Sequence, residues 1–101
     1  MTKIIYPGTF DPIHNGHIDI AKRAAILFDE LEFVVAVNSE KDPLFSIDER
    51  VKLIQDSIHS ISNVKVAEFK GLVVDHAKQT GAKAIIRGLR HVSDFEFEFQ
   101  M

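Results

Sequence analysis

The sequence predicts an α/β protein in which a doubly wound parallel sheet carries helices on both faces. Short apolar runs alternate along the chain with segments whose apolar residues recur at helical spacing. The order strand, helix, strand, helix, strand, helix, strand implies βαβ crossover units, which pair their strands in parallel. No repeat, linker or low-complexity tract interrupts this order, so residues 1–101 are expected to form a single domain.

The expected strands are short apolar runs. Residues 3–6 form the first, and the proline and glycine that follow are expected to stop it. Residues 31–37 form a near-continuous, valine-rich run, which is typical of a strand buried on both faces. Residues 64–69 roughly alternate apolar and polar side chains, and residues 84–86 form the fourth strand.

The expected helices combine apolar spacing with end signals. The first covers residues 17–28, where apolar side chains recur at helical spacing. The second starts at Ser46, a serine three residues before a glutamate as in a capping box, and is expected to end at Asn63. The third covers roughly residues 72–79 and is closed by Gly81 as a C-cap.

The C-terminal residues carry two conflicting signals. Phe95, Phe97 and Phe99 alternate with polar residues, which is the period of a strand. Ser93 and Glu96 instead have the spacing of a capping box, which favours the start of a helix. Both interpretations stay open on the sequence alone.

Composition excludes several classes of function. Lys and Arg number 12 against 15 Asp and Glu, a net charge of −3, so a broad basic surface for nucleic acid is not expected. The absence of cysteine excludes disulfides, thiolate metal sites and a cysteine nucleophile. No apolar run approaches the length of a membrane span, and the N-terminus lacks the features of a signal peptide, so a cytoplasmic protein is expected.

Three loops are candidates for ligand binding, because ligands of doubly wound sheets bind beyond the carboxyl ends of the strands. They are residues 7–17, 38–45 and 87–93. In the third loop, Arg87 and Arg90 follow a buried strand, and arginine is well shaped for bidentate phosphate contacts. Alternatively, the two arginines form surface ion pairs with nearby glutamates, which contribute little. The lysine in the middle loop is alternatively a solvated side chain.

The first loop is the strongest candidate for a phosphate site. Gly8 is expected to turn the backbone sharply and bring it close to a ligand, and Thr9 offers a hydroxyl and an N–H group. His14 and His17 lie three residues apart around Gly16, so both can point to the same place. His17 is expected at a helix start, where free N–H groups and the helix dipole favour an anion.

The histidines also have simpler interpretations. His17 taken alone is equally well a solvated or capping residue at a helix N-terminus. A metal site built on the two loop histidines lacks a carboxylate at matching spacing, and Asp11 is interpreted as a turn residue before a proline. His59, His76 and His91 are expected to be surface or packing residues.

Two stretches of the chain resemble a known enzyme family. Residues 8–17, GTFDPIHNGH, resemble the signature of the nucleotidyltransferase superfamily with the HxGH motif, which residues 14–17 match as written. Residues 85–101, IIRGLRHVSDFEFEFQM, are similar to bacterial phosphopantetheine adenylyltransferases, and the resemblance extends along nearly the whole chain. It implies a Rossmann-like nucleotidyltransferase fold.

The resemblance also implies a reaction and its partners. The family transfers the adenylyl group of ATP to 4′-phosphopantetheine and forms dephospho-coenzyme A and pyrophosphate, a step of coenzyme A biosynthesis. The transfer is a direct in-line displacement without a general base, because the acceptor's phosphate is already ionised near neutral pH. The resemblance further implies Mg²⁺ as cofactor, a homohexamer and coenzyme A as a candidate feedback ligand, with no nucleic acid or membrane partner.

Roles for individual residues follow from the same resemblance. His17, Lys41 and Arg90 correspond to catalytic positions, with His17 stabilising the transition state at the α-phosphate. The positions implied to bind ATP are Thr9, Phe10, His14, His17, Gly88, Leu89, Arg90 and Glu98. The positions implied to bind the acceptor are Thr9, Lys41, Val73 and Arg87.

The chain departs from the family pattern in a few places. His14 stands where the family commonly has threonine, His91 replaces a small residue and Phe97 replaces a tyrosine. Family members continue for roughly half as much again, including a serine-rich segment that contacts ATP and has no match here, so the chain is expected to be the N-terminal and central part of the domain. The alternatives are an HxGH nucleotidyltransferase with another nucleotide or acceptor, and an inactive nucleotide-binding fragment.

Overall fold

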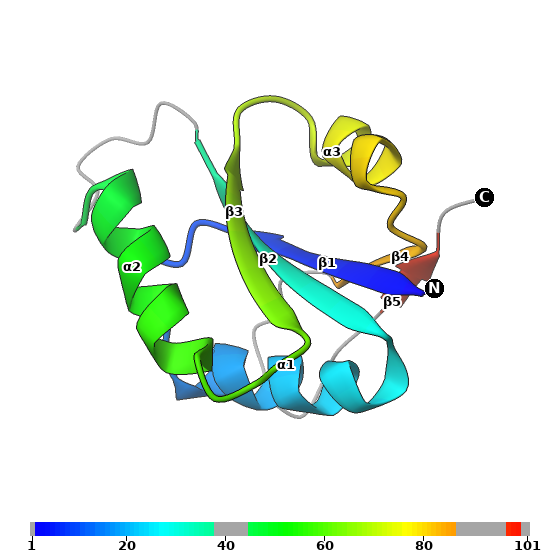
Figure 1. The fold of residues 1–101 in the computed structure, drawn as a ribbon. Helices are drawn as coiled ribbons and strands as arrows, with labels where there is room; N and C mark the ends of the chain where they lie inside the picture. Colours follow the sequence, from blue (N-terminus) through cyan, green and yellow to red (C-terminus); the bar gives the residue numbers. More distant parts are fainter. Residues whose placement is uncertain (1, 38–44, 87–96, 100–101) are drawn as a thin grey trace.

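A five-stranded sheet in the order β3-β2-β1-β4-β5 organises the chain (Figure 1). The computed structural model describes residues 2–37, 45–86 and 97–99. The elements in chain order are β1 (Lys3–Gly8), α1 (Asn15–Leu27), β2 (Glu30–Ala36), α2 (Ile47–Ile58), β3 (Val64–Phe69), α3 (Val73–Thr80), β4 (Ala84–Ile86) and β5 (Phe97–Phe99).

The first four strands are parallel, which confirms the predicted doubly wound sheet. β1 lies between β2 and β4, so successive crossovers lead away from β1 toward both edges of the sheet. β5 pairs antiparallel with β4, with Glu98 opposite Ile85. For residues 97–99 the strand interpretation is therefore correct, while the competing capping box at residues 93–96 lies outside the described residues.

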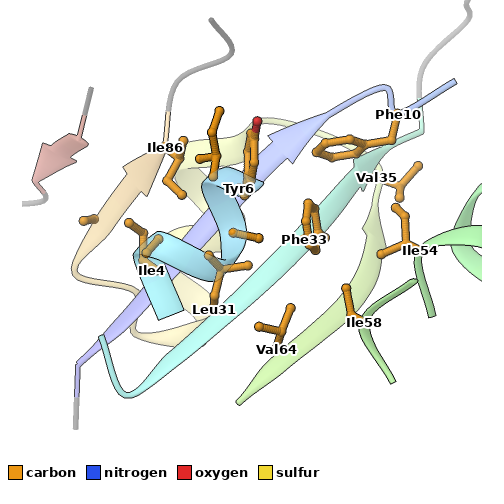
Figure 2. Close-up of a cluster of buried hydrophobic side chains, with 14 residues drawn as sticks. Ile4, Tyr6, Phe10, Leu31, Phe33, Val35, Ile54, Ile58, Val64 and Ile86 are labelled. Carbon is orange, nitrogen blue, oxygen red and sulfur yellow. The ribbon is translucent and has the colours of Figure 1, made fainter. Parts of the chain in front are cut away.

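Buried side chains on the two faces of the sheet form separate clusters, because alternate residues of each strand point to opposite faces. The larger cluster packs α1 and α2 against one face (Figure 2). The smaller cluster packs α3 against the other face, on Ile5 and Val34. Residues 31–35 of β2 are all buried, as the sequence predicts for a central strand. Full burial of a side chain such as Phe33 stabilises the fold by roughly 1.5–3 kcal/mol.

β1 extends two residues beyond the predicted stop. Pro7 and Gly8 both remain in register with β2, opposite Val34 and Val35. Proline lacks a backbone N–H and is tolerated where a strand has a free side. Among the described residues β1 pairs with β4 only at Ile4 and Ile5, so none of them pairs with Pro7 on that side.

The second helix ends earlier than predicted, and Asn63, expected at its end, caps a different helix. α2 stops at Ile58, and Asn63 lies just before β3. The Asn63 side-chain amide donates to the carbonyl oxygens of Ala25 at 2.8 Å and Phe28 at 3.4 Å. These carbonyls belong to the end of α1, where the last groups of a helix lack internal partners.

Two of the predicted helix caps are confirmed. At the start of α2, Ser46 Oγ accepts from the Glu49 N–H at 3.1 Å, and the Glu49 carboxylate accepts from the Ser46 N–H at 2.9 Å. Gly81 ends α3 with a φ of 75°, a left-handed conformation that glycine adopts without steric cost. Within the described ranges, no helix combines the length and the apolar character that a membrane crossing requires.

Candidate functional site

The loop after β1 and the start of α1 form the candidate site. β2, β1 and β4 are adjacent and parallel, so the three loops that follow them leave the same edge of the sheet. α1 begins at Asn15, two residues earlier than predicted, with His14 as its N-cap in an extended conformation. His17 therefore lies within the first helical turn instead of at its first position.

His14 and His17 cap the helix reciprocally. The Nδ1 atom of His14 accepts a hydrogen bond from the Gly16 N–H at 3.1 Å. The Nδ1 atom of His17 accepts from the backbone N–H of His14, also at 3.1 Å. Asn, Asp, Ser and Thr usually perform this task at a helix N-terminus. The capping interpretation of His17 is thus correct, and His14 caps the helix as well, but capping accounts for only one nitrogen of each ring.

The other ring nitrogen, Nε2, is available as a donor in both histidines. A neutral imidazole carries its hydrogen on one nitrogen, and an Nδ1 atom that accepts a hydrogen bond leaves that hydrogen on Nε2. The two rings stack with their centroids 3.7 Å apart and their planes at 26°. Among the described residues neither Nε2 has a hydrogen-bond partner. Two imidazole donors therefore lie side by side at the positive end of a helix.

The surroundings of His17 keep its ring neutral. Burial, and secondarily the electrostatic interaction with the neighbouring His14 ring, lower the pKa of His17 from 6.5 to about 4. The rings of Phe10 and Tyr6 meet the His17 ring edge-on, at centroid distances of 4.9 and 6.1 Å. At neutral pH the side chain is consequently an uncharged N–H donor and not a cation.

The sharp turn in this loop occurs at Phe10 and not at Gly8, where the sequence places it. Phe10 has a φ of 47°, a left-handed conformation that costs a residue with a Cβ of order 1 kcal/mol. Its side chain is buried against Tyr6 and Phe33 (Figure 2). Gly8 instead provides space, because a Cβ there would lie 3.1 Å from the Phe10 ring. Any ligand contact of Phe10 must therefore come from its backbone.

Asp11 and Arg50 tie this loop to the start of α2. The Asp11 Oδ1 atom accepts from the Phe45 N–H at 2.8 Å, so Asp11 does more than form a turn. Arg50 donates from Nε to the carbonyl of Phe45 and from Nη1 to the carbonyl of Thr9, both at 3.0 Å. Arg50 was not expected from the sequence. The available signal is its position four residues before Ile54, on the buried face of α2.

The remaining site residues are placed to different extents. Thr9 is exposed directly after β1, and Val73 is half-buried as the first residue of α3. Glu98 is placed only by its backbone in β5. Five site residues lie outside the described residues: Lys41, Arg87, Gly88, Leu89 and Arg90.

The three histidines expected at the surface or in packing are accounted for where the structure describes them. His59 is exposed at the end of α2. His76 is buried, and its Nε2 atom lies 2.7 Å from the Glu32 carboxylate. His91 lies outside the described residues.

The donor set of the loop suits an anion better than a metal ion. Within the described part of the chain, no group of three His, Cys, Asp or Glu side chains is arranged to hold a metal. The loop offers imidazole N–H donors and helix N–H groups, which bind phosphate or carboxylate oxygens. Mg²⁺ prefers oxygen ligands and in phosphoryl-transfer sites is commonly held by substrate phosphates.

Comparisons with known proteins point to one family. The profile of the family described as cytidylyltransferase-like matches residues 5–101. A phosphopantetheine adenylyltransferase of Heliobacterium modesticaldum is 55% identical over the whole chain. Proteins of the same name from Desulfitobacterium hafniense and Dictyoglomus turgidum are 56% and 54% identical over 96% and 99% of the chain. The chain spans 60–62% of the length of these relatives.

A solved structure has a similar fold. The crystal structure of a lipopolysaccharide core biosynthesis protein from Thermoplasma volcanium matches with a TM-score of 0.66 and 28% sequence identity. The match covers 84% of this chain and 72% of that protein.

Proposed function

Because the chain belongs to the cytidylyltransferase-like family, we propose that the protein transfers the adenylyl group of ATP to 4′-phosphopantetheine. The products are dephospho-coenzyme A and pyrophosphate. The names of relatives at 54–56% identity support this choice of nucleotide and acceptor. The observation that carries the proposal is the paired imidazole donors at the N-terminus of α1, which match the anionic groups of both substrates.

His17 performs the central task in this mechanism. As the acceptor's phosphate oxygen attacks the α-phosphorus of ATP, negative charge builds on the α-phosphoryl oxygens. The His17 Nε2–H donates to one of these oxygens, and the His14 N–H bond to Nδ1 holds the ring in the required tautomer. The acceptor's phosphate is already ionised, so no general base and no covalent enzyme intermediate are needed.

The other proposed residues hold the two substrates. Thr9, Phe10 and His14 contact ATP from the loop after β1, together with Gly88, Leu89, Arg90 and Glu98. Thr9, Lys41, Val73 and Arg87 hold the acceptor. Mg²⁺ would be held mainly by the phosphates of ATP and would there offset their negative charge. A cytoplasmic homohexamer with coenzyme A as a feedback ligand completes the proposal.

Substitution of His17 by asparagine tests the mechanism. Asparagine offers an amide oxygen near the place of Nδ1, so the cap on the His14 N–H survives while the Nε2 donor is removed. In the protein as its gene encodes it, H17N should lower kcat for pyrophosphate release by at least ~100-fold, the scale for one preorganised donor, with little change in the ATP requirement. H59N is the matched control, because His59 is exposed at the far end of α2. Turnover of H17N near that of H59N would exclude the role.

Kinetics with varied substrates test the acceptor. Arg87→Ala and Lys41→Ala should mainly raise KM for phosphopantetheine, and an effect confined to ATP would show that the acceptor is wrongly assigned. The cytidylyltransferase-like profile makes a CTP-dependent transfer the second candidate. A panel of nucleotides and phosphate acceptors distinguishes the two. ATP binding by calorimetry without turnover would identify a binding protein.

A further inference from the structure

Arg50 is a buried cation whose hydrogen bonds go to backbone carbonyl groups. The residue is 4% exposed, in the first turn of α2. Its Nε atom donates to the carbonyls of Phe45 and Ser46 at 3.0 and 3.4 Å, and its Nη1 atom donates to that of Thr9 at 3.0 Å. The guanidinium group therefore connects the start of α2 to Thr9, which lies 41 positions before Arg50 in the sequence.

This position is electrostatically unfavourable for an arginine. The first turn of a helix carries the positive end of the dipole, which disfavours a cation. Within the described residues Arg50 forms no ion pair, so carbonyl oxygens alone replace the water it loses. An apolar side chain of similar volume would avoid these costs, since burying charges is often no more stabilising than burying apolar groups. The hydrogen bonds that Arg50 makes to two separate segments therefore indicate a role other than stabilising the fold.

The bond to Thr9 fixes the direction of the next backbone N–H group. In a trans peptide the carbonyl and the following N–H point in opposite directions. The peptide between Thr9 and Phe10 is trans, since the cis bond in the described chain lies at Asp11–Pro12. The Thr9 carbonyl points to Arg50, so the Phe10 N–H points away from α2. Among the described residues that N–H has no hydrogen-bond partner.

We propose that Arg50 is a positioning residue, which holds the Thr9–Phe10 peptide so that the Phe10 N–H is presented to a phosphate group. This inference rests on the proposed adenylyl transfer. The guanidinium group matters because it donates hydrogen bonds to Thr9 and to the start of α2 at the same time. The hydrogen bond from the Phe45 N–H to Asp11 is a second connection between the same two segments. The left-handed Phe10 follows directly and depends on this support.

The kinetic test compares Arg50→Met, Arg50→Lys and Lys52→Met. K52M is the matched control, because it removes a positive charge from the exposed side of the same helix. R50M should lower kcat roughly 10–100-fold, the scale of a misplaced substrate group, and K52M should stay within about twofold of wild type. R50K keeps the charge but presents a single nitrogen, so it should restore little of the loss. Full activity of R50K or of folded R50M would overturn the proposal.

Amide hydrogen exchange and the amide NMR shift of Phe10 provide a reading that does not depend on catalysis. Both should change in R50K, and in R50M if it folds, while K52M resembles wild type. A Phe10 amide unchanged in R50K would refute the positioning role. If the wild-type protein transfers no adenylyl group, but the Phe10 amide still changes in R50K as expected, the proposed function is rejected. The role of Arg50 in shaping the loop then still stands.

Discussion

Lowering the pH from about 7 to about 4.5 should destabilise the protein through His17. The folded state holds this ring neutral, with a pKa lowered from 6.5 to about 4, mainly by burial. The unfolded chain takes up a proton on His17 as the pH falls through about 6.5, and the folded protein does so only near pH 4. In this window the unfolded state binds more protons, so the free energy of unfolding decreases as the pH falls.

The size of the effect follows from the same pKa. Each tenfold change in proton affinity corresponds to about 1.4 kcal/mol, so the lowering from 6.5 to about 4 allows at most about 3.5 kcal/mol. His17 is partly exposed, and screening by solvent reduces the expected loss of stability to about 1–2 kcal/mol. The stability is fully present above pH 6.5 and is lost progressively toward pH 4.

The measurement is chemical unfolding of wild type and H17N at several pH values. Carboxylates also titrate at low pH, but their effect is common to both proteins and cancels in the difference. H17N keeps an acceptor for the His14 N–H. The two proteins should therefore have similar stability at a pH where His17 is neutral in both the folded and the unfolded state. Relative to H17N, wild type should lose about 1–2 kcal/mol between about pH 7 and 4.5.

An NMR titration provides the direct check. The His17 ring should remain neutral below pH 6, with hydrogen on Nε2 and none on Nδ1. A His17 midpoint at or above 6.5, or a hydrogen on Nδ1 in the neutral ring, would disprove the tautomer on which the proposed mechanism depends. Equal pH dependence of wild type and H17N would disprove the energetic argument.

Two further substitutions test the surroundings of the site. Gly8→Ala should destabilise the protein by about 1–2 kcal/mol, because the new Cβ meets the buried Phe10 ring at 3.1–3.2 Å, and wild-type stability in urea would contradict this packing. His76→Ala should cost about 2 kcal/mol, because the buried Glu32 carboxylate loses its hydrogen bond to His76 and keeps only the Lys3 ammonium, at 3.7 Å. Thermal unfolding should show the His76→Ala loss as a fall in Tm of several degrees, and an unchanged Tm would mean that Lys3 or solvent compensates for the lost hydrogen bond.

The sequence alone determined the order of the elements and the general location of the site. Apolar runs, helical spacing and the Ser46 capping box are local patterns, and each produced the expected element. The parallel order of the strands then placed the loops after β1, β2 and β4 at one edge of the sheet. The HxGH motif indicates both histidines as site residues.

Only the tertiary structure shows which ring nitrogen of each histidine is left to bind a ligand and which contacts hold the loop in place. The tautomer of His17, the left-handed turn at Phe10 and the grip of Arg50 on Thr9 depend on contacts with distant segments or on hydrogen-bond geometry. Asn63 likewise serves the end of α1 from 38 residues away. Periodicity reports which face of an element is buried, but it carries no information about which partner a buried polar group meets there.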